Sequence, residues 1–156
     1  MKKKKIEKPT PEHEAFANAV KQIIGASLEK LGFVFHSYKY TNSFTSIVYL
    51  KPTQFIKIAG STHWQDDSSY YNINLGTGPA DKNFATEWYS VALWHLKRMI
   101  EPSIPVKEYS FPLGNNLIPS ITKANEDLLK YGDRFFKGDF AIFNEIVEKL
   151  SRGETI

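Results

Sequence analysis

The stretch that decides the fold is residues 33–76, FVFHSYKYTNSFTSIVYLKPTQFIKIAGSTHWQDDSSYYNINLG. It contains four short runs rich in β-branched and aromatic residues, a composition typical of strands. Turn-forming residues or a proline separate the runs. We therefore predict strands at 33–40, 44–51, 55–62 and 69–75. Parallel crossovers need a dozen or more residues, and these links are shorter, so the sheet should be an antiparallel meander.

Alternation along the fourth run predicts that the sheet has two different faces. Ile73 and Leu75 alternate with Asn72 and Asn74, and Tyr70 falls on the asparagine side. In an antiparallel sheet one face commonly packs on the core while the other is solvated. We therefore expect helices on the Ile73 face and a partly wet opposite face.

A helix should precede the sheet. Thr10-Pro11-Glu12 has the features of a helix start, with an N-cap threonine, a proline at the first helical position and an acid in the first turn. His13 follows in that turn and should be exposed. Gly32 stands where a glycine would end the helix.

Further helices should follow the sheet. Apolar periodicity predicts a long helix from about 81 to 100 and two C-terminal helices, near 119–132 and from residue 139. Residues 106–111 could add a short edge strand. We predict an α+β fold, in which a four-stranded antiparallel meander is packed by the N-terminal helix and the following long helix.

The charge is distributed unevenly along the 156 residues. Residues 1–8 carry +4 and the whole chain carries +3, so the rest carries −1. Nucleic-acid-binding domains usually carry their basic excess on the folded surface. We therefore predict a disordered basic tail at 1–9 and a single α+β domain at 10–156, a length that suits one core.

The composition also bears on compartment and chemistry. The chain has no cysteine, which excludes disulfides, thiolate nucleophiles and Cys-ligated zinc. In residues 2–8 the only apolar residue is Ile6, whereas a signal peptide has an apolar stretch after its positively charged start. No window approaches 18 apolar residues. We expect no membrane span and a cytoplasmic location.

Motifs for catalysis or metal binding are weak. His63, Asp66 and Asp67 have suitable side chains for zinc or manganese, but all lie on one loop, so a polar turn is favoured. Gly76-Thr77-Gly78 lacks the third glycine and the lysine of nucleotide-binding loops, and no Gly-x-Ser-x-Gly elbow occurs. We predict no metal, no cofactor and no catalytic residues, which favours a non-enzyme while leaving catalysis open.

Aromatic residues are concentrated in the predicted sheet. Strict alternation on the first strand puts His36, Tyr38 and Tyr40 on one face, opposite Phe33 and Phe35. Tyrosine and tryptophan are enriched at binding hot spots, so a cluster on the wetter face would form a binding surface. Burial of these rings under another layer is the alternative. The candidate binding residues are His36, Tyr38, Tyr40, Tyr49, His63, Trp64 and Tyr70.

Two short motifs carry a family resemblance. Leu31-Gly32-Phe33 begins the first strand, and Tyr71-Asn72-Ile73-Asn74-Leu75-Gly76 ends the last one. With residues 12–100, they resemble a bacterial family of small uncharacterised α+β domains that share a Gly-Phe start and an Asn-Leu-Gly end. The resemblance implies an α+β fold and a bacterial cytoplasmic protein, and it transfers no catalytic residue. Some such domains are suspected to neutralise toxins, which favours an immunity-like role.

Three functions remain open from the sequence. The leading hypothesis is a non-enzymatic module that binds another protein. The alternative is a small-molecule-binding protein or enzyme, with a site between the sheet face and the proline-rich residues 101–119. Weak nucleic-acid binding through the lysine-rich tail is the third and least favoured.

Overall fold

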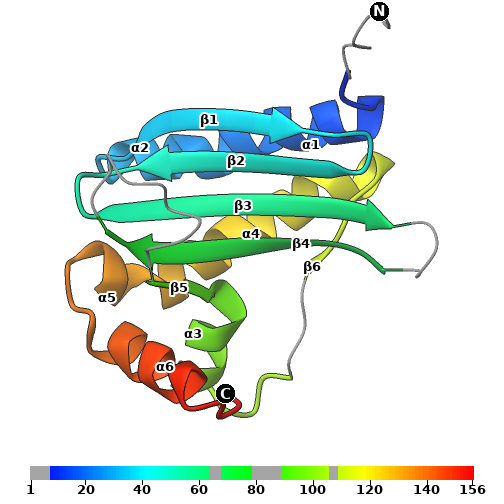
Figure 1. Cartoon of the computed structure of the whole chain (residues 1–156). Helices are drawn as coiled ribbons and strands as arrows, with labels where there is room; N and C mark the ends of the chain where they lie inside the picture. The colour runs from blue at the N-terminus through cyan, green and yellow to red at the C-terminus, as the bar shows by residue number, and fades with distance from the viewer. Residues whose placement is uncertain (1–7, 64–67, 79–88, 106–108) are drawn as a thin grey trace, which may run out of the picture.

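The computed structural model of this chain describes residues 8–63, 68–78, 89–105 and 109–156 (Figure 1). It has an α+β fold built on one antiparallel sheet. Figure 1 shows the helices α1 and α4 running behind the sheet, while α3, α5 and α6 gather beside the β5 end. The fold class predicted from the sequence is confirmed, but the sheet has six strands instead of four.

The sheet is a meander with one added strand. Its strands are β1 (Val34–Tyr40), β2 (Phe44–Leu50), β3 (Gln54–His63), β4 (Ser68–Thr77), β5 (Tyr89–Ala92) and β6 (Tyr109–Ser110). Strands β1 to β5 lie side by side in chain order, and β6 pairs with β4. Every pairing is antiparallel. The four predicted strands and their meander order are therefore confirmed.

The predicted helix over 81–100 is wrong in part. Residues 81–88 lie outside the described residues, but 89–92 form β5 and only Leu93–Ile100 forms a helix, α3. Val91 lies opposite Leu75 on β4 and is buried, whereas Ser90 is exposed. Over four residues, the apolar pattern of a strand cannot be distinguished from that of one helical turn. Pairing with β4 makes these residues a strand.

The N-terminal helix follows its local signals. It comprises α1 (Pro11–Val20), a π-helical turn η1 (Lys21–Gly25) and α2 (Ala26–Lys30). The Thr10 side chain accepts a hydrogen bond from the His13 backbone N–H at 3.3 Å, which satisfies one of the free donors of the first turn. Gly32 has a φ of 91°, the left-handed conformation that ends helices at glycine. The predicted start and end are confirmed.

The C-terminal third is helical. It contains the 3₁₀ turn η2 (Gly114–Asn116), α4 (Leu117–Tyr131), α5 (Asp133–Phe136) and α6 (Ala141–Ser151). The two predicted C-terminal helices correspond to α4 and α6, and α5 is additional. The Asp139 side chain accepts a hydrogen bond from the Ala141 N–H at 3.1 Å, which supports the start of α6.

The core lies between the sheet and the helices behind it. Ile47, Ile58 and Ile73 stand opposite one another on β2, β3 and β4, and each is at most 1% exposed. Helix α4 packs against α1 and η1 across this face. The remaining large buried side chains include Phe16, Ile24, Leu28, Tyr49, Ile56, Tyr71, Leu75, Ile121, Leu128, Phe143 and Ile146.

A β-bulge in β1 changes which side chains share a face. Phe35 lies opposite Tyr49 and Tyr38 lies opposite Ile47, with a register shift between Phe35 and Ser37. The extra residue reverses the alternation, so Phe35 and Tyr38 lie on the same, helix-packed side. The Lys21 ammonium of η1 confirms this, because it lies 5.0 Å from the Phe35 ring centroid and 4.9 Å from that of Tyr38. The prediction that these two side chains point in opposite directions is wrong.

None of the helices within the described ranges is both long and apolar enough to cross a lipid bilayer.

Candidate functional site

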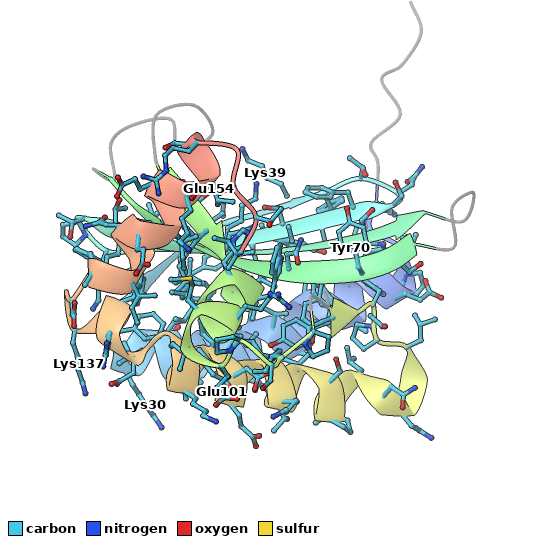
Figure 2. The ribbon with its side chains drawn as sticks, turned by 90° about the horizontal axis from the view of Figure 1, so that it is seen from below. Lys30, Lys39, Tyr70, Glu101, Lys137 and Glu154 are labelled. Carbon is cyan, nitrogen blue, oxygen red and sulfur yellow. The ribbon has the colours of Figure 1, made fainter. Side chains whose placement is uncertain are left out.

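The predicted aromatic cluster is split across the sheet. Tyr49 is 2% exposed and packs closely against Gly25 of η1, so it belongs to the core face. Tyr38 and Tyr40 pair with Ile47 and Thr45 on that same side. Tyr70 lies on the opposite face of the sheet, as does Lys39, and both are labelled in Figure 2. Clustering of all four tyrosines on the wetter face is therefore wrong, because the bulge and helix packing turn three of them inward.

The other predicted residues are also dispersed. His36 is exposed at the bulge of β1, at the opposite edge of the sheet from β5. His63 ends β3 opposite Ser68. Trp64, Asp66 and Asp67 lie outside the described residues. Among the residues that are described, no three histidine, aspartate or glutamate side chains group as metal ligands. A binding role for the predicted residues stays a prediction.

A pocket does lie beside the proline-rich segment. It measures about 350 Å³ and is bounded by α3, residues 104 and 105, β6 and α4. We call it the Asp127 pocket, and its lining consists of Trp94, Lys97, Ile104, Pro105, Tyr109, Ser110, Lys123 and Asp127. Ligand sites in proteins are typically concave and combine apolar walls with a few placed polar groups, and this pocket has both.

Asp127 is the polar centre of the pocket. Its carboxylate lies 3.0 Å from the Lys97 ammonium and 3.2 Å from the Lys123 ammonium, and it accepts a hydrogen bond from the Tyr109 hydroxyl at 2.7 Å. Burial alone would raise the pKa of Asp127, but the hydrogen bonds from Tyr109, Lys97 and Lys123 outweigh burial and lower that pKa. The carboxylate is therefore ionised at neutral pH and fully engaged by cationic and hydroxyl donors.

The tyrosine that donates to this carboxylate stacks on a second, buried tyrosine. The Tyr109 ring lies parallel to that of Tyr71, with centroids 5.1 Å apart. The Tyr71 hydroxyl is hydrogen-bonded to Ser120 on α4. Burial raises the pKa of Tyr71 to about 12, and burial with the nearby Asp127 charge also raises the pKa of Tyr109. Both phenols therefore stay protonated near neutral pH, where they serve as hydrogen-bond donors and not as bases.

Among its described lining residues, the Asp127 pocket has a net positive charge. Lys97 and Lys123 bring two positive charges to the single negative charge of Asp127. The Lys97 side chain is 18% exposed and pairs with the carboxylate inside the pocket. The Lys123 side chain is 67% exposed and pairs with it at the rim. The excess of one positive charge next to Trp94 favours an anionic group that carries an apolar portion.

A second pocket adjoins the first. It also measures about 350 Å³ and shares Tyr109 and Ser110 with the Asp127 pocket. We call it the Leu113 pocket, and its other lining residues are Phe111, Pro112, Leu113, Asn116 and Ser120. No charged side chain lines it among these residues. The pair of pockets thus combines a charged part with a mainly apolar part, and Tyr109 and Ser110 of β6 line both.

The histidines outside the pocket are engaged structurally. His13 was expected to be exposed, but it is 1% exposed because its ring lies between the Thr45 and Thr62 hydroxyls, at 2.5 and 3.0 Å. Its ring also packs on Phe111, with centroids 4.8 Å apart. His95 accepts a hydrogen bond from the Ala92 N–H at 3.0 Å at the start of α3. His13 and its partner Thr45 are both almost fully buried, so this histidine–hydroxyl contact has no access for a substrate and supports the packing of α1 on the sheet.

Stability should fall in mild acid because of these histidines. Burial lowers the pKa of His13 and of His95 below the ordinary value of 6.5. The unfolded chain therefore binds more protons than the folded chain as the pH drops below about 6.5, and the free energy of unfolding decreases until the folded pKa values are passed. The expected loss is about 1.4 kcal/mol for each unit by which the folded and unfolded pKa values differ. Urea titrations at a series of pH values measure it.

Substitution assigns this pH dependence. In His13→Gln, the part of the pH-dependent loss of unfolding free energy that is due to His13 should disappear. The part that is due to His95 should remain. A free energy of unfolding that is constant or increases as the pH falls through 6.5 would contradict the burial of both neutral rings.

Sequence reasoning missed the residues of the Asp127 pocket. One signal was present: Asp127 falls on the inward stripe of α4 with Ala124, Leu128 and Tyr131, all of them buried. An acid on a buried stripe needs partners, and Lys123 stands one helical turn before it. The other partners, Lys97 and Tyr109, come from distant segments, and only the fold brings them to α4.

Comparisons with protein-family models, curated proteins and solved structures give no match to this chain. The resemblance to small bacterial α+β domains therefore stays a prediction, and the function has to be argued from the site itself.

Proposed function

We propose that this chain is a non-enzymatic module that binds another protein, and that the Asp127 pocket receives an acidic group of that partner. The observation that carries the proposal is the geometry around Asp127, where two lysines converge on one carboxylate beside Trp94. An incoming carboxylate would meet the exposed ammonium of Lys123 at the rim. Charge-assisted hydrogen bonds of this kind are the stronger ones in proteins.

The state of the polar groups favours binding over catalysis. Asp127 is ionised but already accepts from three donors, so it is a poor general base. The phenols of Tyr71 and Tyr109 stay protonated. The described histidines with lowered pKa values, His13 and His95, contact structural partners. These groups stabilise a fixed surface, which suits recognition.

The surroundings of the pockets favour a protein partner. Leu113, which lines the Leu113 pocket, is 55% exposed, and Ile118 in the first turn of α4 is 52% exposed. Exposed apolar side chains with polar surroundings often mark protein contact surfaces. The pocket volume of about 350 Å³ also suits a small anionic molecule, which is the second candidate.

Reversing the charge of Lys123 tests the proposal. Lys123→Glu should weaken partner binding about tenfold or more, because it replaces an attractive charge by a repulsive one at the pocket rim. Lys137→Glu is the matched control, since Lys137 is similarly exposed and also forms an i,i+4 pair, with Asp133 on α5. Capture from extracts of the native cell, followed by calorimetry with the purified partner, measures both.

The result discriminates the two candidates. A stoichiometric protein that is retained by the wild type and Lys137→Glu, and lost with Lys123→Glu, supports the proposal. If a captured partner binds Lys123→Glu as well as the wild type, the Asp127 pocket is not its site. If only a small anion is recovered, and it is lost with Lys123→Glu, the second candidate is correct.

Two weaker proposals concern the cell. A cytoplasmic location fits a chain without cysteine, and an origin in bacteria follows only from the resemblance of the strand motifs. Weak nucleic-acid binding would depend on Lys2 to Lys5, outside the described residues, and it is the least supported function.

A further inference from the structure

The β6 strand exposes one side of its backbone. Ser110 lies opposite Tyr70, and Tyr109 lies opposite Tyr71. The Phe111 N–H donates to the Ser69 carbonyl at 3.0 Å, so the pair 111–69 is a hydrogen-bonded pair of the ladder. In antiparallel ladders such pairs alternate with non-hydrogen-bonded ones. Ser110 is therefore in a non-hydrogen-bonded position, and its own N–H and C=O point away from β4.

The two pockets lie around this backbone. Both the Asp127 pocket and the Leu113 pocket include Ser110 in their lining, and Ser110 is exposed. The small serine side chain leaves room for another chain to approach. Figure 1 shows β6 alongside the first part of β4, between α3 and the start of α4.

We propose that the partner contributes an extended segment that adds as a strand along β6 and pairs with the backbone of Ser110. An acidic side chain of that segment enters the Asp127 pocket, and an apolar side chain two residues away enters the Leu113 pocket. This inference rests on the proposed function, and it specifies both the kind of partner and its mode of binding. Adding a strand to a sheet edge is an established mode of peptide recognition.

The spacing and charges fit this ligand. Side chains two residues apart on a strand point to the same face about 7 Å apart, which suits two pockets that share Tyr109 and Ser110. The excess positive charge of Lys97 and Lys123 over Asp127 complements one acidic side chain. Leu113 and Pro112 offer apolar contact to the second side chain.

The strand contact should be short. β6 has only two residues, and Pro112 follows two residues after Ser110. Proline donates no backbone hydrogen bond, so it limits pairing beyond Ser110. Binding then depends on the two side chains in the pockets, with the backbone pairing at Ser110 fixing their register.

Selection from a random peptide library on the purified full chain tests the inference. We expect enrichment of peptides with an acidic and an apolar residue two positions apart. Binding of the enriched peptide to Lys123→Glu should be about tenfold weaker or worse, whereas Lys137→Glu should bind like the wild type. Replacing the acidic residue of the peptide by its amide should have a similar effect.

The backbone contact is tested separately. Ser110→Pro removes an N–H that points away from β4, so it should keep the β4 pairing and weaken the peptide about tenfold. Because this variant could also disturb folding, single N-methylation of the peptide backbone on the wild-type protein is the second measurement. Methylation at one position should weaken binding similarly, and a circular dichroism melt checks that Ser110→Pro is folded.

Each result has a definite meaning. If Lys123→Glu abolishes binding while Ser110→Pro and every N-methylated peptide bind normally, strand addition is wrong and the Asp127 pocket proposal stands. If Ser110→Pro and N-methylation weaken binding but Lys123→Glu does not, the pocket proposal fails. If no peptide is enriched, or if free glutamate competes as well as the peptide, the extended-segment inference is overturned.

Discussion

Asp127→Ala should lose about 3–5 kcal/mol of the free energy of unfolding, because it breaks a buried ion pair. The Lys97 side chain, 18% exposed, would keep its charge without the carboxylate that compensates it. The Tyr109 hydroxyl would lose its acceptor at 2.7 Å in the same variant. Leaving a largely buried charge and a donor unpaired costs more than the contact itself contributes. Urea unfolding followed by circular dichroism measures the loss.

A matched carboxylate serves as the control for this prediction. Asp133 also pairs with a lysine at 3.0 Å, but that pair with Lys137 is exposed, so Asp133→Ala should cost less than about 1 kcal/mol. Asp127→Asn should fall between the two, since its amide oxygen can still accept from Tyr109. Equal losses for Asp127→Ala and Asp133→Ala would show that the pocket carboxylate is not the stabilising centre inferred from its contacts.

Gly25→Ala should lose about 1–3 kcal/mol, although alanine intrinsically favours a helix over glycine by about 1 kcal/mol. Gly25 ends the π-helical turn η1, and a methyl group there would overlap the hydroxyl end of Tyr49 on β2. Gly25 and Tyr49 are both buried, so neither the helix nor the sheet can shift without disturbing the core. Close-packed interiors resist such added volume. Thermal and urea unfolding measure the change.

A double-mutant cycle isolates the close approach. Tyr49→Phe removes the hydroxyl nearest to the added methyl group. The cost of Gly25→Ala should therefore be smaller in the Tyr49→Phe background than in the wild type. If the cost is the same in both, the contact between η1 and β2 does not explain the need for glycine at this position.

Local signals in the sequence predicted much of the fold. The N-cap Thr10, Pro11 and Gly32 determine where the first helix begins and ends, because capping depends only on neighbouring backbone groups. The short links after β1, β2 and β3 require antiparallel hairpins. Residues 89–92 were misassigned as helix because their burial depends on pairing with β4, a contact that no local pattern records.

The candidate site was harder to predict for the same reason. The tyrosines of β1 were assigned by strict alternation, which the bulge between Phe35 and Ser37 reverses. The pocket residues Lys97, Tyr109 and Asp127 lie on α3, β6 and α4. The Lys97 and Asp127 charges and the Tyr109 hydroxyl meet only after the chain has folded, so no spacing in the sequence predicts the trio. Two pockets do include residues of the proline-rich segment in their lining, whereas a functional site there stays a prediction.

The irregularity in β1 has a consequence for the behaviour of concentrated samples. β1 is the outermost strand of the sheet, and Val34 and Phe35 on it are 68% and 42% exposed. A straight, apolar edge strand can pair with the edge strand of another molecule, which leads to aggregation or fibrils. The kink before Ser37, followed by the ammonium of Lys39, interrupts such growth halfway along the strand. We therefore expect little edge-to-edge aggregation through β1 at high protein concentration.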